Sequence, residues 1–267
     1  MIYNAKNGVV KIDDTEMDYI AFGKGDKNLV MIPGLGDGLK TAKGTAVPFS
    51  IMYRKLVKDF RVYAFSRRNV IPQGYTTRDM ARDVHFAMKQ LGIKEAYVVG
   101  VSQGGMISQY LAIDYPELVK KLILTVTLAR QNEVVRPVIR NWMEMAKRGD
   151  YKGIMIDTAE NSYSQVYLKK MRPLYSVIGN IGKPKSFDRF LIMGEACLTH
   201  NAYEELHKIK CPTLIIGGKE DKILTGEASK EIAEKIEGSS LYMYEGLGHG
   251  LYEEAKDFLP RVMEFFR

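Results

Sequence analysis

The sequence predicts an α/β protein with a mostly parallel central sheet, helices on both faces of that sheet, and an inserted helical lid. Over most of the 267 residues, short apolar runs rich in Val and Ile alternate with amphipathic stretches of helical period. This alternation stops between residues 128 and 202 and then returns. We therefore expect a core made of residues 1–127 and 203–267, with residues 128–202 inserted as a helical cap.

The elements of the core follow one another in a regular order. The polar turn Asp13-Asp14-Thr15 predicts that the first two strands form a hairpin. Gly92 is placed to end the helix before it, in the C′ position. The expected elements, in order, are strands at 8–12, 17–22 and 29–32, a helix at 48–59, a strand at 61–65, a helix at 77–91, a strand from residue 96, a helix at 106–114, strands at 121–126 and 213–216, a helix at 227–237, a strand at 241–244 and a helix at 252–266.

The inserted segment 128–202 reads as a series of helices. Its first helix has Pro137 near the start, and Gly149, Gly153, Gly179 and Gly182 are expected to break the segment. The segment carries twelve Lys or Arg against seven Asp or Glu, so it holds most of the formal charge of +7. A solvated helical surface explains this charge most simply, and a lid that attracts anionic substrates or acidic surfaces is the alternative.

Composition excludes several classes of protein. No apolar run approaches the roughly 20 residues of a membrane span, and the N-terminus does not resemble a signal peptide. The basic residues are scattered among acidic ones, which argues against a nucleic-acid partner. Neither Cys197 nor Cys211 has a Cys or His partner at metal-ligand spacing, so we expect no metal site and no disulfide framework. A cytoplasmic protein is the simplest expectation.

The run from Ala96 to Met106 holds the pattern Gly-x-Ser-x-Gly between an apolar strand and a helix. A serine at such a turn lies in a strained backbone conformation with its hydroxyl exposed above the sheet. Gly100 and Gly104 leave room where side chains would collide, and the helix after Ser102 points free N–H groups toward it. The pattern predicts that Ser102 is a nucleophile, with a flexible turn and an ordinary helix N-cap as the alternative.

A serine nucleophile needs a base to take its proton, and that base is usually histidine. His249 lies in the glycine-rich loop 246–250, directly after the strand at 241–244. The other three histidines lie in or beside helical segments: His85, His200 and His207. The glycines around His249 allow the backbone to bring its imidazole close to another loop, so His249 is the candidate base.

The base in turn needs an acid to orient it. Glu220 and Asp221 both follow the strand at 213–216, whereas no carboxylate follows the strand at 121–126. Because the carboxyl ends of parallel strands meet at one edge of a sheet, Ser102, His249 and this acid are expected to converge there.

These features resemble the α/β-hydrolase superfamily, in its lidded branch of small esterases and lactonases, over nearly the whole chain. The order Ser102, Asp221, His249, each after a predicted strand, is the order found in that fold. The segments 30–36, 217–221 and 246–249 are similar to its oxyanion, acid and histidine loops: Val-Met-Ile-Pro-Gly-Leu-Gly, Gly-Gly-Lys-Glu-Asp and Gly-Leu-Gly-His. The resemblance implies that Ser102 is the nucleophile, His249 the general base and then acid, and Asp221, not Glu220, the orienting acid.

The resemblance also implies an oxyanion hole formed by the backbone N–H groups of Leu35 and Gln103, and no metal or organic cofactor. Two departures from the family pattern concern the shape of the site. Ser66-Arg67-Arg68-Asn69 stands where the family commonly has Asp-x-Arg-Gly, and Pro33 replaces the common histidine before Gly34.

The predicted function is a carboxylesterase-type serine hydrolase that cleaves an ester-like acyl bond through an acyl-Ser102 intermediate. The Tyr- and Met-rich segment 128–202 favours a small to medium apolar acyl substrate as the partner. Thioesterase, lactonase and C–C bond hydrolase activities use the same apparatus and remain alternatives, whereas haloalkane dehalogenation needs an aspartate in place of Ser102. A second class of function is a signalling receptor or partner-binding regulator that keeps an intact triad.

Overall fold

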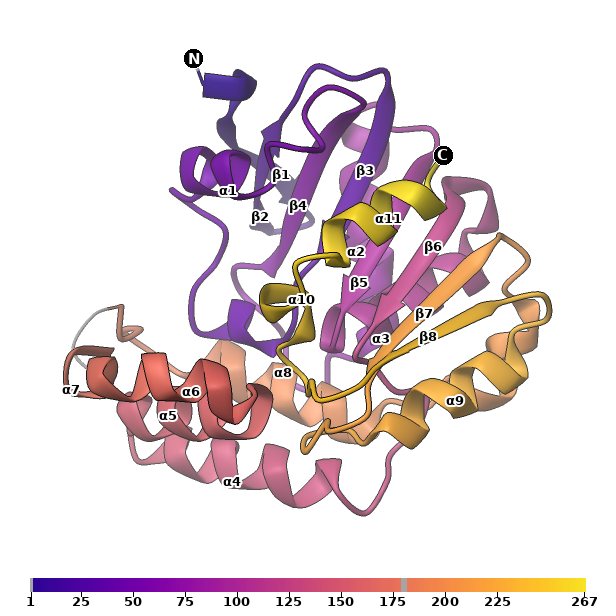
Figure 1. Ribbon diagram of the computed structural model, residues 1–267. Coiled ribbons are helices and arrows are strands. Elements are labelled where there is room, and N and C mark those ends of the chain that lie inside the picture. The colour runs from indigo at the N-terminus through magenta and orange to yellow at the C-terminus, as the bar shows by residue number, and fades with distance from the viewer. Residues whose placement is uncertain (1, 179–181) are drawn as a thin grey trace.

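An eight-stranded sheet runs through the computed structural model, which describes residues 2–178 and 182–267, in the strand order β1-β2-β4-β3-β5-β6-β7-β8 (Figure 1). The strands are β1 (Lys6–Ile12), β2 (Thr15–Phe22), β3 (Lys27–Ile32), β4 (Phe60–Arg68), β5 (Ala96–Val101), β6 (Val119–Thr125), β7 (Thr213–Gly218) and β8 (Ser240–Tyr244). β1 and β2 form the predicted hairpin and β2 pairs antiparallel with β4, while β4, β3 and β5 to β8 run parallel. The expected mostly parallel sheet is therefore confirmed.

The register of the parallel strands brings their carboxyl ends to one edge. Ile32 of β3 pairs with Gly100 of β5, and Val101 of β5 pairs with Thr125 of β6. Gly218 of β7 pairs with the last residue of β8. The loops that follow β3, β5, β7 and β8 therefore leave the sheet side by side, which is where open α/β folds bind their ligands.

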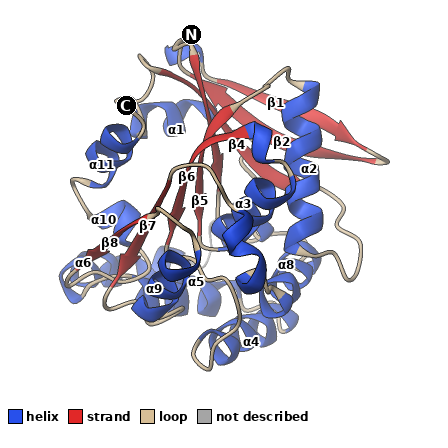
Figure 2. Ribbon diagram, turned by 90° about the vertical axis from the view of Figure 1, so that its right-hand side faces the viewer, coloured by secondary structure: helices blue, strands red, loops and turns tan. Residues whose placement is uncertain are grey.

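Helices cover both faces of the sheet, and each face has its own apolar cluster (Figure 2). On one face, α1 (Ala46–Met52) and α11 (Phe258–Phe265) pack on the strands. On the other face lie α2 (Thr77–Gln90), α3 (Gln103–Asp114) and α9 (Gly226–Lys235). The short helix α10 (Leu251–Glu254) follows the β8 loop.

The chain between β6 and β7 is helical, as expected, and its helices gather at one end of the sheet (Figure 1). We call this segment, residues 128–202, the insertion. Its helices are α4 (Val135–Lys147), α5 (Tyr151–Ser162), α6 (Gln165–Met171), α7 (Tyr175–Ile178) and α8 (Asp188–Thr199). None of the described helices combines the length and the apolar character needed to cross a bilayer.

Two predicted helices differ from the structure. The helix expected at 48–59 is α1, which ends at Met52, and residues 53–59 form successive turns that lead into β4. The helix expected at 252–266 is two helices, α10 and α11, separated near Ala255. Pro260 accounts for the break, because a proline fits the first turn of a helix but not its interior.

The glycines expected as breaks in the insertion behave differently from one another. Gly149 and Gly182 adopt positive φ angles of 70° and 84° outside helices, as expected. Gly153 was expected to be a break, but it lies inside α5, where its N–H is capped by the Asp150 carboxylate at 2.8 Å. Gly179 lies outside the described residues. In the core, Gly92 ends α2 with a φ of 68°, as predicted.

Candidate active site

Ser102 lies at the sharp turn between β5 and α3, with φ 55° and ψ −120°. Its N–H donates to the carbonyl of Thr125 at 2.9 Å, and its carbonyl accepts from Thr127 Oγ1 at 2.8 Å. Its side chain makes no capping hydrogen bond to α3, so the alternative of an ordinary N-cap serine is wrong. A positive φ at a non-glycine residue is strained, and here it is held by the neighbouring strand β6.

The two glycines of the pattern are required by close contacts. A Cβ at Gly104 would lie 1.9 Å from the carbonyl oxygen of Ile32 at the end of β3. A Cβ at Gly100 would lie 2.3 Å from Ser108 Oγ and 2.5 Å from the carbonyl oxygen of Gly104. The contacts are with the end of β3 and with α3, the Gly104 backbone included, and they fix the turn against the sheet.

The predicted oxyanion donors lie on two different elements beside Ser102. Leu35 begins the 3₁₀ turn η2 (Leu35–Gly38), and Gln103 is the first residue of α3. A Cβ at Gly34, just before η2, would lie 3.3 Å from Ser102 Cβ, so this loop passes directly over the serine. Within the described residues neither the Leu35 nor the Gln103 backbone N–H has a hydrogen-bond acceptor, which leaves both free to bind an oxyanion.

The side chain of Gln103 is fully buried and points away from the site. Its amide nitrogen donates to the carbonyl of Met193 at 2.7 Å and contacts Cys197 Sγ at 3.1 Å, both on α8. Its amide oxygen accepts from Arg67 Nη2 at 3.2 Å. Gln103 can therefore offer the site only its backbone N–H, as expected from the turn geometry.

Arg67 is a buried cation beneath the predicted oxyanion loop, within the segment 66–69 that departs from the family pattern. Its Nη2 also donates to the carbonyl of Pro33, the other departure. Its Nε and Nη1 have no partner among the described residues. Burial lowers the pKa of Arg67 to about 10, against the attraction of Asp37, so Arg67 stays charged at neutral pH.

Asp221 and His249 meet across the loops after β7 and β8. Asp221 Oδ2 lies 2.8 Å from His249 Nδ1, and Asp221 Oδ1 accepts the N–H groups of Ile223 and Leu224 at 2.8 and 2.9 Å. Glu220, the competing acid, is exposed. Because a carboxylate only accepts, Nδ1 of His249 donates to Asp221, and in the neutral imidazole the lone pair is then on Nε2.

The environment keeps Asp221 ionised. Burial by itself would raise the pKa of its carboxyl, but the His249 interaction and the two backbone N–H groups outweigh burial and hold the pKa below its ordinary value. His249 is also buried, with 8% of its surface exposed. The pair is thus a dry, charge-assisted hydrogen bond that fixes one tautomer and one ring orientation.

Of the three expected triad residues, Ser102 stands apart, because its hydroxyl makes no hydrogen bond to another described residue. His249 Nε2 likewise has no partner in the described part of the chain. Catalytic hydrogen bonds are often long in a free enzyme and shorten when substrate binds. The structure therefore brings the acid and the base together and leaves both the hydroxyl and the imidazole lone pair unengaged.

The remaining histidines have structural surroundings. His200 is buried between α2 and α3, where Nδ1 lies 2.8 Å from Thr77 Oγ1 and Nε2 lies 3.2 Å from Gln109 Oε1, and burial lowers its pKa to about 3. His85 stacks on the ring of Tyr115 at a centroid distance of 4.1 Å. His207 is exposed. Across residues 2–178 and 182–267 no group of three His, Cys, Asp or Glu is arranged to hold a metal ion.

Sequence reasoning missed two contacts between the insertion and the segments that carry the predicted site residues, η2 and the loop around His249. Arg189 of α8 donates to the side chain of Asp37 in η2 at 3.0 Å. At the other contact, Gly250 N–H donates to the carbonyl of Ser162 at 2.8 Å, and Glu254 accepts from the backbone N–H and hydroxyl of Ser164. These partners lie about 90 to 150 residues apart in the chain, and no local pattern connects them.

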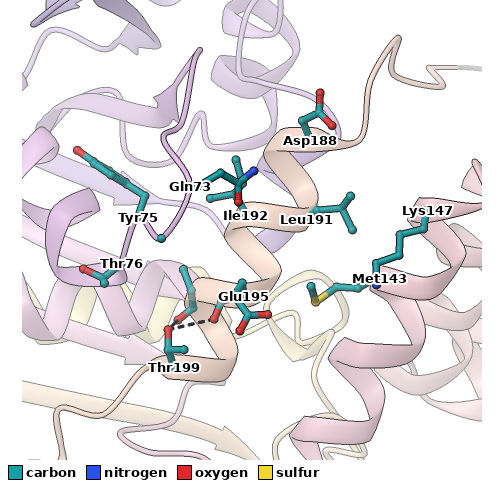
Figure 3. A pocket seen from close by; sticks show the side chains of 12 residues that line it. Gln73, Tyr75, Thr76, Met143, Lys147, Asp188, Leu191, Ile192, Glu195 and Thr199 are labelled. Atoms are coloured by element: carbon teal, nitrogen blue, oxygen red, sulfur yellow. Dashed lines mark hydrogen bonds between the residues drawn. The ribbon is translucent and has the colours of Figure 1, made fainter.

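A cleft of about 420 Å³ lies beside α8, between this helix, α4 and the loop before α2 (Figure 3). Its lining comes from α8, from α4 and from the loop before α2: Gln73, Gly74, Tyr75, Thr76, Met143, Lys147, Asp188, Leu191, Ile192, Glu195, Ala196 and Thr199. Ser102, Asp221 and His249 do not line it. The cleft is therefore distinct from the candidate site.

A family model described as "alpha/beta hydrolase fold" matches residues 27–256 of the chain. The chain is 30% identical to the AB hydrolase superfamily protein YisY of Bacillus subtilis, covering 80% of this chain and 81% of that protein. It is 24% identical to 3-oxoadipate enol-lactonase 2 of Acinetobacter baylyi, covering 87% and 86%. Among solved structures it resembles MGS-M2, an alpha/beta hydrolase enzyme from a Medee basin deep-sea metagenome library, with a TM-score of 0.84, 21% identity and 97% of both chains covered.

Proposed function

The chain belongs to the α/β-hydrolase family, and we propose that it is a serine hydrolase that cleaves a carboxylic ester-like acyl bond through an acyl-Ser102 intermediate. The observation that carries the proposal is the 2.8 Å pair of Asp221 and His249 at the same sheet edge as the strained Ser102 turn. The family relationship supports a hydrolase, and the arrangement of these three residues supports the serine mechanism.

The proposed reaction follows from the roles these groups can fill. His249 Nε2 takes the Ser102 proton as Oγ attacks the carbonyl carbon, and Asp221 stabilises the imidazolium that forms. The free N–H groups of Leu35 and Gln103 bind the oxyanion of the tetrahedral intermediate. His249 then protonates the leaving group, and a water activated by the same imidazole releases the acyl group from Ser102.

We propose an apolar acyl substrate of small to medium size, because the insertion above the site is rich in Tyr and Met. An ester or a lactone fits this chemistry equally well, since both place a carbonyl carbon before Ser102 and an alkoxide as the leaving group. The enol-lactonase relative supports including lactones among the candidate substrates. We propose that the insertion acts as a lid over this substrate.

A fluorophosphonate probe tests the nucleophile directly, because it reacts covalently with the hydroxyl of an activated serine. The wild-type chain is expected to be labelled once, and Ser102→Ala is expected to abolish both labelling and turnover of p-nitrophenyl esters. Asn201→Ala, a substitution outside the site, serves as the matched protein control. Labelling that persists in Ser102→Ala would falsify the assignment.

The same assays separate the enzyme from the alternative of a signalling receptor or partner-binding regulator. A panel of p-nitrophenyl esters of rising chain length, with lactones and thioesters beside it, gives the substrate class. Turnover of many molecules per second by one member of the panel supports the hydrolase. Labelling of Ser102 without turnover of any member, together with tight binding of a protein partner, would support the regulator instead.

A further inference from the structure

Helix α8 contacts both of the elements that carry the predicted oxyanion donors. Arg189, Met193 and Cys197 follow one another at intervals of four, so they share one face of the helix. Met193 and Cys197 hold the side chain of Gln103, the first residue of α3. Arg189, at the other end of this face, holds the turn η2 that begins with Leu35.

Several hydrogen bonds join Arg189 to η2 and to the neighbouring end of β4. Its Nη1 donates to the Asp37 carbonyl at 2.8 Å and its Nη2 to Asp37 Oδ2 at 3.0 Å. It also donates to the carbonyls of Arg67 and Arg68 at 3.2 and 3.3 Å. Only 18% of the Arg189 side chain and 2% of the Asp37 side chain are exposed, so water screens this ion pair poorly.

The turn η2 also lies directly against the backbone of α8. A Cβ at Gly38 would lie 2.7 Å from Phe190 Cα, a distance that only glycine permits. Asp37 is fixed from the core side as well, because its Oδ2 accepts the backbone N–H of Arg67 at 2.8 Å. The carboxylate of Asp37 is therefore the point at which α8, β4 and η2 are joined.

We propose that Arg189 is a positioning residue that sets the spacing of the two oxyanion donors, by clamping η2 to the same helix that holds Gln103. The inference rests on the proposed function, because it assigns Leu35 and Gln103 N–H to the oxyanion. Arg189 acts through Asp37 and touches neither substrate nor Ser102. An N–H donor displaced by about 1 Å stabilises the oxyanion of the transition state much less, whereas substrate binding in the ground state changes little.

The test replaces Arg189 by Met, which keeps an unbranched apolar stem and removes the guanidinium with its charge and donors. For a p-nitrophenyl ester, kcat is expected to fall about tenfold with KM within about twofold, since one donor is misplaced rather than removed. Affinity for an arylboronic acid, whose tetrahedral adduct places an oxygen in the hole, is expected to fall by the same factor. Arg189→Lys, which keeps one charged donor, is expected to lie between Met and the wild type.

A matched control separates positioning from stability. Arg78 of α2 makes a bidentate pair with Asp114 at 2.8 and 2.5 Å, at the opposite end of α3 from Ser102, so Arg78→Met is expected to leave kcat unchanged. Asp37→Asn is the second variant if Arg189→Met does not fold. It is expected to lower kcat similarly, and the double variant Asp37→Asn with Arg189→Met is expected to be no slower than Arg189→Met alone.

Three outcomes overturn the inference and leave the proposed function intact. One is a folded Arg189→Met with wild-type kcat and boronate affinity, and another is an equal loss of kcat in Arg78→Met. A raised KM at unchanged kcat also overturns it, since that would make Arg189 a substrate-binding residue. A wild-type chain that neither labels with fluorophosphonate nor turns over any ester overturns the proposed function, and this inference with it.

Discussion

The turn at Ser102 and the loop at His249 are held in place by different parts of the molecule. The Ser102 turn is fixed within the core, by the end of β3 against Gly104 and by hydrogen bonds to Thr125 and Thr127. The His249 loop rests partly on the insertion, through Gly250 N–H and the side chain of Glu254. Both loops leave the same edge of the sheet.

The core and the insertion therefore position different parts of the candidate site. The position of the candidate nucleophile follows mainly from close contacts among the strand ends of the core, and the insertion contacts this turn only through the side chain of the next residue, Gln103. The positions of the candidate base and of the turn η2 depend on side chains of the insertion. We therefore expect substitutions in the insertion to alter turnover while the Ser102 turn stays intact, and the predictions below test this contrast.

The largest expected effect concerns the acid. Asp221→Asn would present an amide to His249 and favour the wrong tautomer, so kcat for an ester is expected to fall about 10³- to 10⁴-fold. Glu220→Gln, the matched change at the exposed neighbour, is expected to leave kcat unchanged. Steady-state kinetics of both variants decide the matter. The opposite pattern, with activity lost only in Glu220→Gln, would assign the acid to Glu220.

The next effect tests the steric origin of the Ser102 turn. Gly104→Ala would place a Cβ 1.9 Å from the Ile32 carbonyl oxygen of β3. Relieving this clash requires the backbone of β3 or of α3 to move, which costs stability. We expect the free energy of unfolding to drop by at least about 3 kcal/mol, measured by urea denaturation. Gly36→Ala, whose Cβ would meet no atom within 4 Å, is the stability control. Equal stability of the two variants would contradict the steric explanation.

A third prediction concerns the junction of the insertion with the core at His200. Burial holds its pKa at about 3, below the ordinary value near 6.5, so only the unfolded chain binds a proton between these values. Its contribution to stability is present above pH 6.5 and is lost as the pH falls through this window. Between pH 7 and pH 5 the loss is expected to be about 2 kcal/mol.

Urea denaturation at several pH values measures this effect. His200→Gln is expected to flatten the pH dependence between pH 7 and pH 5, while the exposed His207→Gln keeps the wild-type slope. An unchanged slope in His200→Gln would show that another group causes the loss.

The smallest expected effect concerns the His249 loop. Glu254→Ala removes both hydrogen bonds to Ser164 and weakens the attachment of the loop to the insertion, so kcat is expected to fall about tenfold. Glu245→Ala, which breaks an exposed ion pair with Lys219 beside the same loop, is expected to change kcat little. A loss of similar size in both variants would contradict a specific role for the insertion.

Much of the fold was predictable because its signals are local. The strands of the core are apolar runs, and α2 has a clear helical period that ends at Gly92. The errors also have local causes. Pro260 divides the predicted last helix in two, and Gly153 fits inside α5 because the Asp150 carboxylate caps its N–H. In both places a single side chain outweighed the general pattern.

The sequence by itself determined which residues follow which strands, and hence that Ser102, Asp221 and His249 would lie at one sheet edge. It also determined the Ser102 turn, since glycines at 100 and 104 are required by backbone contacts. Only the tertiary structure decided how Arg67 lies buried under the predicted oxyanion loop. It also decided how Arg189 joins η2 to the insertion and how Glu254 joins the His249 loop to it. Those contacts join side chains far apart in the chain, and their energy comes from burial and geometry that no local pattern encodes.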